Sequence, residues 1–406
     1  MRTYFTMLLL AAIVSFLITP FAQRLAFLIG AVDRPDPRKI HRAPTARTGG
    51  IAVLLGFCAP WAFLYLLDNQ VVRMFQQQET TFFVLVGCGL AMFALGVADD
   101  ILNLNPRTKL LIQAAVAVVM YFGGFRISEV SNPVTAPIPL GWFSLPVTVL
   151  WIVGITNATN LLDGMDGLVA GVAAVMALSL SMINILGGNV LVALLTFSLA
   201  GATLGFLPFN FTPARIFLGD SGSLFIGVMM AGISTLSFFK AATATLVLIP
   251  LLLFALPLFD TTQVVIGRLR RGQHPFSPDK NHVHHRLMRL GLNQRQAAVF
   301  LYTVTLFLGV ASIILSWRIT PTAFVTLAIV GVSLATGFVA GARFLARQSL
   351  EDSKDGPSPS TPSTPSGTSG TSETSVAAVT SVASAPDAPV AAEGTPQRPT
   401  PPTPMP

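Results

Sequence analysis

The chain has 406 residues and a formal net charge of +7; 52% of its residues are hydrophobic and only 11% are charged. Soluble domains carry about 25% charged residues, so this composition excludes a large soluble protein and predicts an all-α, multi-pass membrane protein. The sequence contains no soluble basic domain that would bind nucleic acid. Cys58 and Cys88 lie in apolar runs, which is typical of small core residues and says nothing about the redox compartment.

Apolar runs predict about eleven membrane spans, because a span needs roughly 17 to 25 apolar residues. The first run, Tyr4 to Ile29, is longer than the core of a cleaved signal peptide, so we expect it to be retained. A Pro- and Gly-rich segment at 125–145 predicts a short hairpin or a re-entrant piece, and Pro250 and Pro257 predict a kink in the ninth span. The predicted spans lie near residues 4–29, 50–67, 81–98, 109–124, 144–161, 167–187, 190–208, 221–239, 242–266, 296–316 and 320–345.

The charge of the loops predicts the orientation in the membrane. With the N-terminus outside, the inner segments hold 17 Lys and Arg residues and the outer segments hold five. The positive-inside rule therefore predicts an outer N-terminus and a cytoplasmic C-terminus. We expect a membrane domain at 1–350 and a tail at 351–406, which has twelve prolines and no aromatic residue. Such a tail cannot bury enough apolar surface to fold, so it is predicted to be disordered and to serve as a tether or spacer.

Acidic and histidine residues are unevenly divided between the two predicted faces. The outer face keeps only three acids, Asp68, Glu79 and Glu129. Acids at or within a membrane boundary are costly and are usually functional. The distribution therefore predicts one site at the cytoplasmic face, built from several loops. Its candidate residues are Asp99 and Asp100 after span three, Asp163 and Asp166 after span five, Asp220 after span seven, Asp260 near the inner end of span nine, and His41, His274, His282, His284 and His285.

Two motifs place acidic residues beside groups that could bind an anion. In "GVADDILNLNPRTKLLIQ", Asp99 and Asp100 point about 100° apart on a helix, so one could hold a metal while the other accepts a proton. Lys109 in the same motif could face an anionic substrate; the alternative is a helix end meeting water. In "RIFLGDSGSLFIG", Asp220 resembles a metal ligand beside an anion-binding helix start, or a simple N-cap. Phe217 in that motif packs at the membrane interface or stacks on a base.

Two further motifs supply amides and imidazoles. In "NATNLLDGMDG", polar residues spaced by three predict a slanting helical stripe, and Gly164 and Gly167 permit close approach of a ligand; the alternative is a polar helix end. In "GQHPFSPDKNHVHHRLMRLG", the histidines could form a zinc site, yet no cysteine is near and the spacing gives poor tetrahedral geometry. We interpret them as donors to phosphate or sugar oxygens, or else as part of a solvated basic loop. The carboxylates suit a hard ion such as Mg²⁺.

Clustered carboxylates, glycines that admit anions and basic loops together favour metal-assisted phosphoryl transfer. A site at the inner membrane face suggests one lipid-bound substrate and one water-soluble substrate.

Five motifs in order, from "DRPDPRKIHRAPTARTGG" to "HPFSPDKNHVHHRLMRLG", resemble the signature of the polyprenyl-phosphate N-acetylhexosamine-1-phosphate transferases over residues 30–295. The resemblance implies a bacterial plasma-membrane enzyme with a cytoplasmic active site. Polyprenyl phosphate would attack the β-phosphorus of a UDP-N-acetylhexosamine, giving polyprenyl-diphosphate-sugar and UMP. It also implies Mg²⁺, with Mn²⁺ as a substitute, and allows a homodimer.

The resemblance assigns a role to each matching residue. Ala46 stands where the family usually has a second proline, so the shape of the first inner loop is left open. The implied roles are Asp99 as base with Asp100 beside it; Lys109 on phosphate oxygens; Asp220 and Asp163 on the metal; Asn157, Asn160 and Asp166 along the nucleotide and sugar pocket; Phe217 on uracil; His282, His284 and His285 at the diphosphate and sugar; and Lys39, His41 and Arg47 in a loop over the nucleotide.

The "HVHH" pattern resembles the branch that transfers N-acetylglucosamine (GlcNAc) 1-phosphate, so UDP-GlcNAc is the favoured donor. The alternative is the phospho-MurNAc-pentapeptide transferase branch of peptidoglycan synthesis. The product could initiate a lipopolysaccharide, a teichoic acid or another envelope glycan. Two rivals belong to other classes: a proton-coupled secondary transporter, and a non-catalytic membrane scaffold with a recruiting tail.

Overall fold

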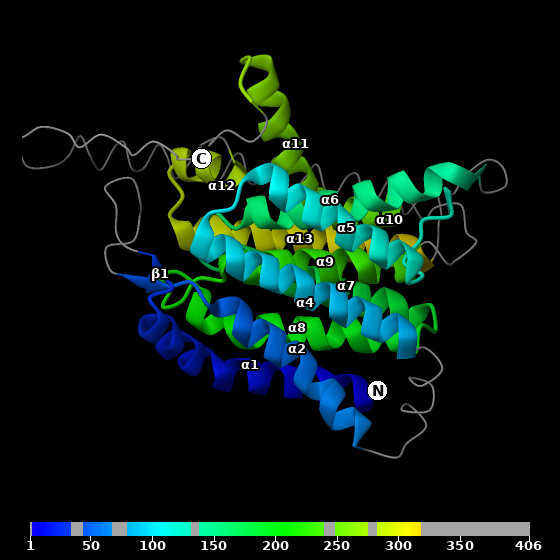
Figure 1. Ribbon diagram of the computed structural model, residues 1–406, viewed down its shortest axis with the longest axis horizontal. Coiled ribbons are helices and arrows are strands. Elements are labelled where there is room, and N and C mark those ends of the chain that lie inside the picture. Colours follow the sequence, from blue (N-terminus) through cyan, green and yellow to red (C-terminus); the bar gives the residue numbers. More distant parts are fainter. Residues whose placement is uncertain are drawn as a thin grey trace, which may run out of the picture. The chain divides into compact units, whose positions relative to one another are not determined.

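The computed structural model describes residues 2–33, 44–66, 79–130, 138–238, 248–274 and 282–317. The predicted last span at 320–345, the tail at 351–406, and Lys39 and His41 lie outside these residues. The elements, shown in Figure 1, are α1 (Arg2–Ile29), β1 (Val32–Asp33), β2 (Thr45–Ala46), α2 (Gly49–Tyr65), α4 (Glu79–Leu102), α5 (Pro106–Phe122), β3 (Glu129–Val130), β4 (Ile138–Pro139), the 3₁₀ helix η1 (Gly141–Phe143), α6 (Ser144–Leu162), α7 (Leu168–Leu186), α8 (Val190–Asn210), α9 (Gly219–Phe238), α10 (Leu248–Leu253), α11 (Ala255–Arg270), α12 (Val283–Arg289) and α13 (Gln294–Trp317).

The described part is nearly all helical, and six of its helical segments are long and apolar enough to cross a membrane. Every predicted span up to residue 316 contains a helix, which confirms an integral membrane protein. That eleven segments cross the membrane stays a prediction. The six segments are Arg2–Ile29, Glu79–Leu102, Gly141–Leu162, Leu168–Leu186, Val190–Asn210 and Gln294–Ser316.

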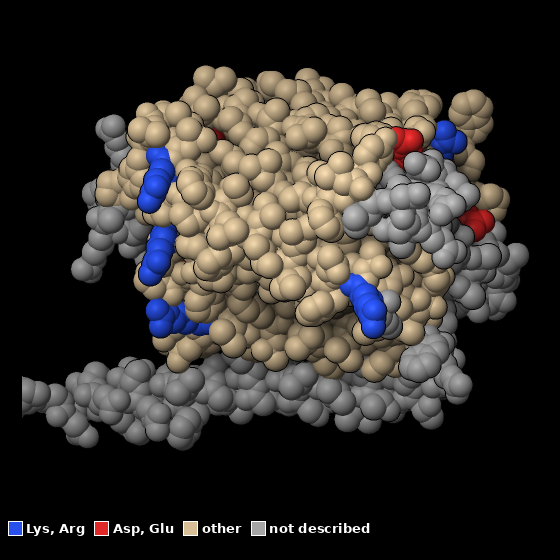
Figure 2. Space-filling view, turned by 90° about the horizontal axis from the view of Figure 1, so that it is seen from below, with Lys and Arg blue, Asp and Glu red and all other residues tan. Residues whose placement is uncertain are grey.

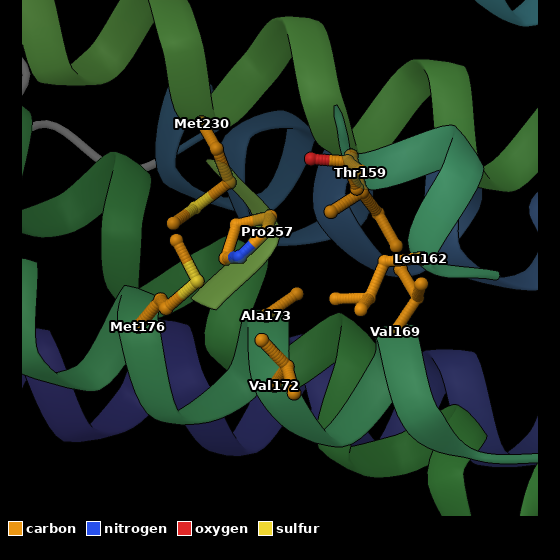
Figure 3. Close-up of a pocket in the computed structure, with 9 residues that line it drawn as sticks. Thr159, Leu162, Val169, Val172, Ala173, Met176, Met230 and Pro257 are labelled. Atoms are coloured by element: carbon orange, nitrogen blue, oxygen red, sulfur yellow. The ribbon is translucent and has the colours of Figure 1, made fainter. Parts of the chain in front are cut away.

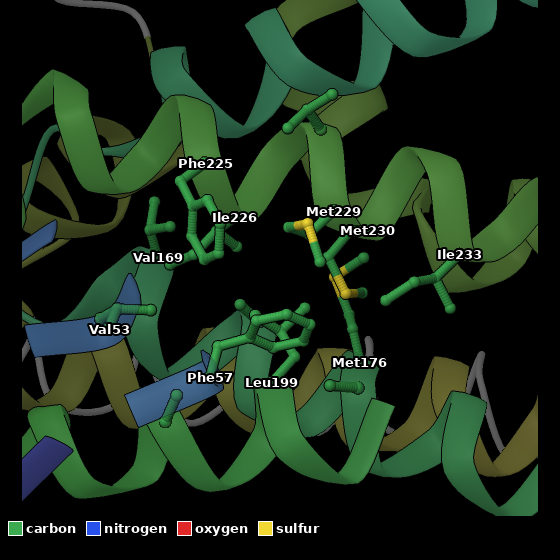
Figure 4. Packing of buried hydrophobic residues seen from close by; sticks show 14 of the residues in the cluster. Val53, Phe57, Val169, Met176, Leu199, Phe225, Ile226, Met229, Met230 and Ile233 are labelled. Carbon is green, nitrogen blue, oxygen red and sulfur yellow. The ribbon is translucent and has the colours of Figure 1, made fainter. Parts of the chain in front are cut away.

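Helix α9 lies at the centre of the bundle and is buried on all sides. It packs against α2, α4, α6, α7 and α8. Figure 4 shows Phe225 and Met229 of α9 in the same apolar cluster as Phe57 of α2, Met176 of α7 and Leu199 of α8. Among the described side chains of α9, only that of Asp220, at its first turn, is partly exposed. A helix that is apolar on all sides belongs in a core. Among the described residues of α9, the polar and partly exposed part is therefore its first turn, at Asp220.

Glycines let the neighbouring helices approach this N-terminus closely. A Cβ on Gly96 of α4 would lie 2.3 Å from Cα of Ser221, and a Cβ on Gly50 of α2 would lie 2.5 Å from the backbone nitrogen of Gly222. Small residues that allow backbones to meet are the usual device of helix packing in membranes. The close contact brings the last turn of α4 beside the first turn of α9.

The structure confirms the local interruptions that the sequence predicts. The ninth predicted span divides into α10 and α11 at Phe254. The reason is Pro257, which has no N–H to donate to the carbonyl of Leu253 four residues earlier. In the 125–145 segment, β3 and β4 pair antiparallel with Glu129 opposite Pro139, which is the predicted short hairpin.

Charged side chains lie toward the ends of the helices. In Figure 2, Lys and Arg side chains gather at the left edge, which is the edge where β1 lies in Figure 1. A broad surface without charged side chains separates them from the charged residues nearer the opposite edge. This banding is what a bilayer requires, because charges within its hydrocarbon core are costly.

The contact at Gly96 predicts that Gly96→Ala forces α4 and α9 apart and lowers the thermal midpoint in detergent. Overpacking of this kind costs about 1–3 kcal/mol. The matched control is Gly87→Ala in the same helix, where an added Cβ meets nothing within 4 Å. A midpoint for Gly96→Ala equal to that of Gly87→Ala would contradict the packing.

Candidate active site

A lysine lies between two carboxylates where α4 and α5 meet α9. Asp99 is buried, and its Oδ1 accepts a hydrogen bond of 2.9 Å from the Leu104 backbone N–H. Its Oδ2 is paired with Nζ of Lys109, which also lies 3.7 Å from Oδ2 of Asp220. The short loop between the helices is closed by Asn105, whose side chain caps the N-terminus of α5. The arrangement therefore holds one ammonium group for two acids.

Asp100 caps the N-terminus of α9. Its Oδ1 and Oδ2 accept hydrogen bonds of 3.2 Å from the backbone N–H groups of Asp220 and Ser221. Gly219 precedes them with φ of +75°, and a Cβ there would lie 2.8 Å from Asp100 Oδ2 and 2.4 Å from the Arg47 carbonyl oxygen. Only glycine fits this position. The helix start that the sequence predicts to bind an anion thus already holds a carboxylate of the chain itself.

The described residues before α2, 44–48, lie beside residues 216–218, which lead into α9. Strand β2 pairs with β1, and the Phe217 N–H donates to the Ala46 carbonyl at 2.8 Å. The Gly49 N–H in turn donates to the Phe217 carbonyl at 3.0 Å. This pairing carries Arg47 beside Gly219. Phe217 is fixed through its backbone and its ring is half-buried; stacking of that ring on a base stays a prediction.

Asn160 and Asp163 complete the cluster around Asp220. Nδ2 of Asn160 donates to Asp220 Oδ1 at 3.2 Å and to Ser223 Oγ at 2.8 Å. Burial raises the pKa of Asp163 to about 8, and the negative charges of Asp220 and Asp100 add to the shift, while Arg47 opposes it. The polar cluster, Asp99, Asp100, Lys109, Asn160, Asp163 and Asp220, therefore contains more acidic than basic side chains.

The predicted single stripe of four polar residues is wrong beyond Leu162, because α6 ends there and Asp163 is its C-cap. The two outer members have other protein partners. Asn157 donates to Oε1 of Gln113 on α5, whereas Oδ2 of Asp166 accepts from the Ala214 N–H at 3.0 Å. Thus Asn157 faces α5 and Asp166 fixes the loop before α9. Sequence reasoning missed Gln113, although a glutamine four residues after Lys109 in an apolar helix is a usable signal.

The histidine segment, residues 282–285, packs against the turn that follows α6. The ring of His284 is 1% exposed, and a Cβ on Gly164 would lie 2.6 Å from its Cε1 atom. The ring is stacked with that of His282 and lies beside that of His285, with centroids 5.7 and 4.3 Å away. Burial lowers the pKa of His284 to about 4, with the charge of His285 as a smaller cause, so this ring is neutral at pH 7.

Asp260 of α11 holds the start of this segment. Its Oδ2 lies 2.8 Å from Nδ1 of His282, and its Oδ1 accepts from the Val283 N–H at 2.6 Å. The sequence marks Asp260 as an inner-end acid but gives it no role.

A separate apolar cavity is lined by residues of α6, α7, α9 and α11 (Figure 3). Met176, Met230 and Pro257 line it, and its one polar side chain, Thr159, already donates its hydroxyl to the Ile155 carbonyl. A phosphate or sugar would find no partner there, so the polar cluster is the candidate active site.

The donors of the cluster fit a hard divalent cation. In the described ranges, no three His, Cys, Asp or Glu side chains form a ready metal cluster. Mg²⁺, however, is usually held by one or two carboxylates with waters and substrate phosphates as its other ligands. Asp163 and Asp220 are such a pair, and their shortage of positive charge favours a cation. Zinc fits less well, because zinc sites use three or four His, Cys, Asp or Glu ligands, and no such group of three is present among the described residues.

Comparison with known proteins bears on the same residues. The sequence profile of glycosyl transferase family 4 matches residues 82–238, which contain Asp99, Asp100, Asp163 and Asp220. A Bacillus subtilis protein, named a probable undecaprenyl-phosphate N-acetylglucosaminyl 1-phosphate transferase, is 37% identical over 300 residues, covering 74% of this chain and 81% of the relative. The chain belongs to glycosyl transferase family 4.

Other relatives carry names of the same kind. The decaprenyl-phosphate N-acetylglucosaminephosphotransferase of Mycolicibacterium smegmatis is 34% identical, covering 72% of this chain and 77% of that protein. The undecaprenyl-phosphate alpha-N-acetylglucosaminyl 1-phosphate transferase of Escherichia coli is 28% identical, covering 69% and 75%. These matches confirm that this family 4 chain has the relatives that its motifs predict.

The site predicts that Gly164→Ala displaces the ring of His284. We expect His284 to be protected from diethyl pyrocarbonate in the unsubstituted protein and to become reactive in the variant, as read by mass spectrometry. Gly154→Ala in α6 is the control, since an added Cβ there meets nothing within 4 Å. Continued protection of His284 in Gly164→Ala would show that the two residues are not in contact.

Proposed function

We propose that this chain transfers GlcNAc 1-phosphate from UDP-GlcNAc to polyprenyl phosphate, with undecaprenyl phosphate as the expected lipid, and releases UMP. The observation that carries the proposal is the gathering of Asp99, Asp100, Asp163, Asp220 and Lys109 at the N-terminus of α9. The relatives named above all take their names from polyprenyl phosphates and N-acetylglucosamine.

The same proposal places the enzyme in the bacterial plasma membrane with its site on the cytoplasmic face. The N-terminus would lie outside and the C-terminus inside. The excess of Lys and Arg in the inner segments supports this orientation. UDP-sugars are made in the cytoplasm, and the lipid phosphate lies at the bilayer surface, so the boundary position of the acids suits both substrates. A homodimer stays a prediction.

The reaction requires the protein to bring together two anions, the lipid phosphate and the diphosphate of UDP-GlcNAc. An oxygen of the lipid phosphate forms a bond to the β-phosphorus of UDP-GlcNAc, while the bond from that phosphorus to the bridging oxygen breaks and UMP leaves. The ammonium group of Lys109 would neutralise phosphate oxygens. It would bind the substrate in place of part of its ion pair with Asp99. Asp99, once released, would accept the proton of the lipid phosphate. Positioning and charge stabilisation supply most of the rate in phosphoryl transfer.

Asp220 and Asp163 would hold Mg²⁺, or Mn²⁺ in its place. When bound, the cation supplies positive charge to the diphosphate. Asn160 would keep the Asp220 carboxylate in position through its 3.2 Å hydrogen bond. Asp100 would hold the N-terminus of α9, and so the backbone of Asp220, at a fixed place.

The nucleotide and the sugar would lie between the first inner loop and the histidine segment. Phe217 and Arg47 border the start of α9 on one side. On the other side, the ring of His284 lies against Gly164. We assign uracil to the side of Phe217 and the diphosphate-sugar to the histidines. The remaining pocket residues in this proposal are Asn157, Asp166, His282 and His285, together with Lys39 and His41, which lie outside the described residues.

The other hypotheses find less support. The relatives described above are named for GlcNAc transfer, which disfavours the phospho-MurNAc-pentapeptide reaction. Transporter sites lie near the membrane midplane, whereas these acids lie at helix ends. A non-catalytic scaffold would have no need of crowded, buried carboxylates.

The purified protein should release UMP from UDP-GlcNAc only when polyprenyl phosphate and a divalent cation are both present. A panel of UDP-sugars, assayed for UMP and for the lipid product, measures the class of reaction and the donor together. We expect UDP-GlcNAc to be the best donor. No UMP release with any member of the panel would rule out the proposed function.

Asp220→Asn should abolish UMP release while the protein remains folded in detergent. Lys109→Met should lower kcat by about 10²–10³, the usual effect of removing one charge-stabilising donor. Glu79→Gln is the control, because Glu79 begins α4 at the end opposite Asp99. Full activity in Asp220→Asn would exclude its role as a metal ligand.

A further inference from the structure

We propose that Asp260 is a positioning residue that fixes the tautomer and orientation of His282 for the transfer reaction. The inference rests on the proposed function, in which the histidine segment faces the diphosphate-sugar. It adds a residue from α11, an element that lies outside the quoted motifs and outside residues 82–238, which match the family profile.

Asp260 is fully buried, with 0% of its surface exposed. A buried carboxylate is tolerated only when its oxygens are hydrogen-bonded. Each oxygen has one partner from the histidine segment: Oδ2 meets His282 Nδ1 at 2.8 Å, and Oδ1 accepts the Val283 N–H at 2.6 Å. The carboxylate thus holds both the side chain and the backbone at the start of α12.

The chemistry of this pair sets the proton on the imidazole. An ionised carboxylate can only accept hydrogen bonds, so Nδ1 of His282 must carry a proton. The other ring nitrogen, Nε2, is then a proton acceptor when the ring is neutral and a donor when it is charged. A carboxylate behind a histidine fixes both its tautomer and the direction of its ring.

Contacts carry this orientation to the polar cluster. The ring of His282 is nearly parallel to that of His284, at an interplanar angle of 16°. His284 in turn lies over Gly164, the residue after Asp163. Rotation of the His282 ring would therefore disturb the packing of His284 against Gly164, next to Asp163.

The position of Asp260 follows from the break in the ninth predicted span. Helix α11 begins at Ala255, after the break at Phe254, and Asp260 lies in its second turn, with its carboxylate at the start of α12.

Asp260→Asn tests the proposal with little change in shape. The amide can still accept from the Val283 N–H, but its NH₂ group then faces Nδ1 of His282, which must accept, so the proton moves to Nε2. We expect kcat for UMP release to fall about 10- to 100-fold, as is usual for such supporting carboxylates. The KM for polyprenyl phosphate and the thermal midpoint should stay close to those of the unsubstituted protein.

The tautomer is read directly by ¹⁵N NMR of protein labelled at histidine, with His282→Gln used to assign the signal. In Asp260→Asn the His282 signal should change from the Nδ1–H to the Nε2–H form. The matched control is Gln263→Met, which removes a second link between α11 and α12, the 2.9 Å hydrogen bond from Arg286 Nη1 to Gln263 Oε1, without touching His282. It should keep both the tautomer and the activity.

Full activity in Asp260→Asn, or an unchanged His282 signal, would overturn the inference. So would equal losses of activity and thermal midpoint in Asp260→Asn and Gln263→Met, since that result means a merely structural role. Failure of the proposed function is distinguishable, because the unsubstituted protein would then release no UMP while the change of tautomer would still be seen.

Discussion

Two hydrogen bonds from the first turn of α9 to the carboxylate of Asp100 hold the candidate site together. Helix α9 is buried by its neighbours, and free N–H groups at its start would be costly next to the bilayer. Asp100 satisfies two of them from α4. The contact requires the close approach at Gly96 and the left-handed conformation of Gly219. Once α4 is fixed there, the adjacent Asp99 and, through it, Lys109 are brought to the side chain of Asp220.

The consequence is that the chain supplies too little positive charge to keep all of these carboxylates ionised. Lys109 serves two carboxylates, and the pKa of Asp163 is raised to about 8 by burial and by its acidic neighbours. Separate anionic substrates would add to the repulsion unless cations enter with them. The proposed binding of a phosphate together with a metal ion would relieve this repulsion, whereas the apolar cavity of Figure 3 has no charged side chain in its lining.

Much of this arrangement could be predicted from the sequence, and the missing part has a common cause. Apolar runs predict the helices, and acidic residues gathered on one predicted membrane face indicate the site. Both signals depend on residue type alone. What the sequence does not reveal is which partner each polar group takes. Asn157 pairs with Gln113 on another helix, and Asp260 pairs with His282, which lies 22 residues later in the chain. Such pairs depend on how helices cross, which spacing along one segment does not encode. The stripe expected from "NATNLLDGMDG" also assumed a helix that in fact ends at Leu162.

Binding of the donor's diphosphate with a cation beside Asp220 and Asp163 is tested most directly by a cryo-EM structure with UDP-GlcNAc and Mg²⁺. We expect density for the diphosphate and the cation beside Asp220 and Asp163, within reach of Lys109, with the sugar toward His282 and His284. Well-defined nucleotide density elsewhere, with Asp220 and Lys109 still paired as they are here, would contradict it.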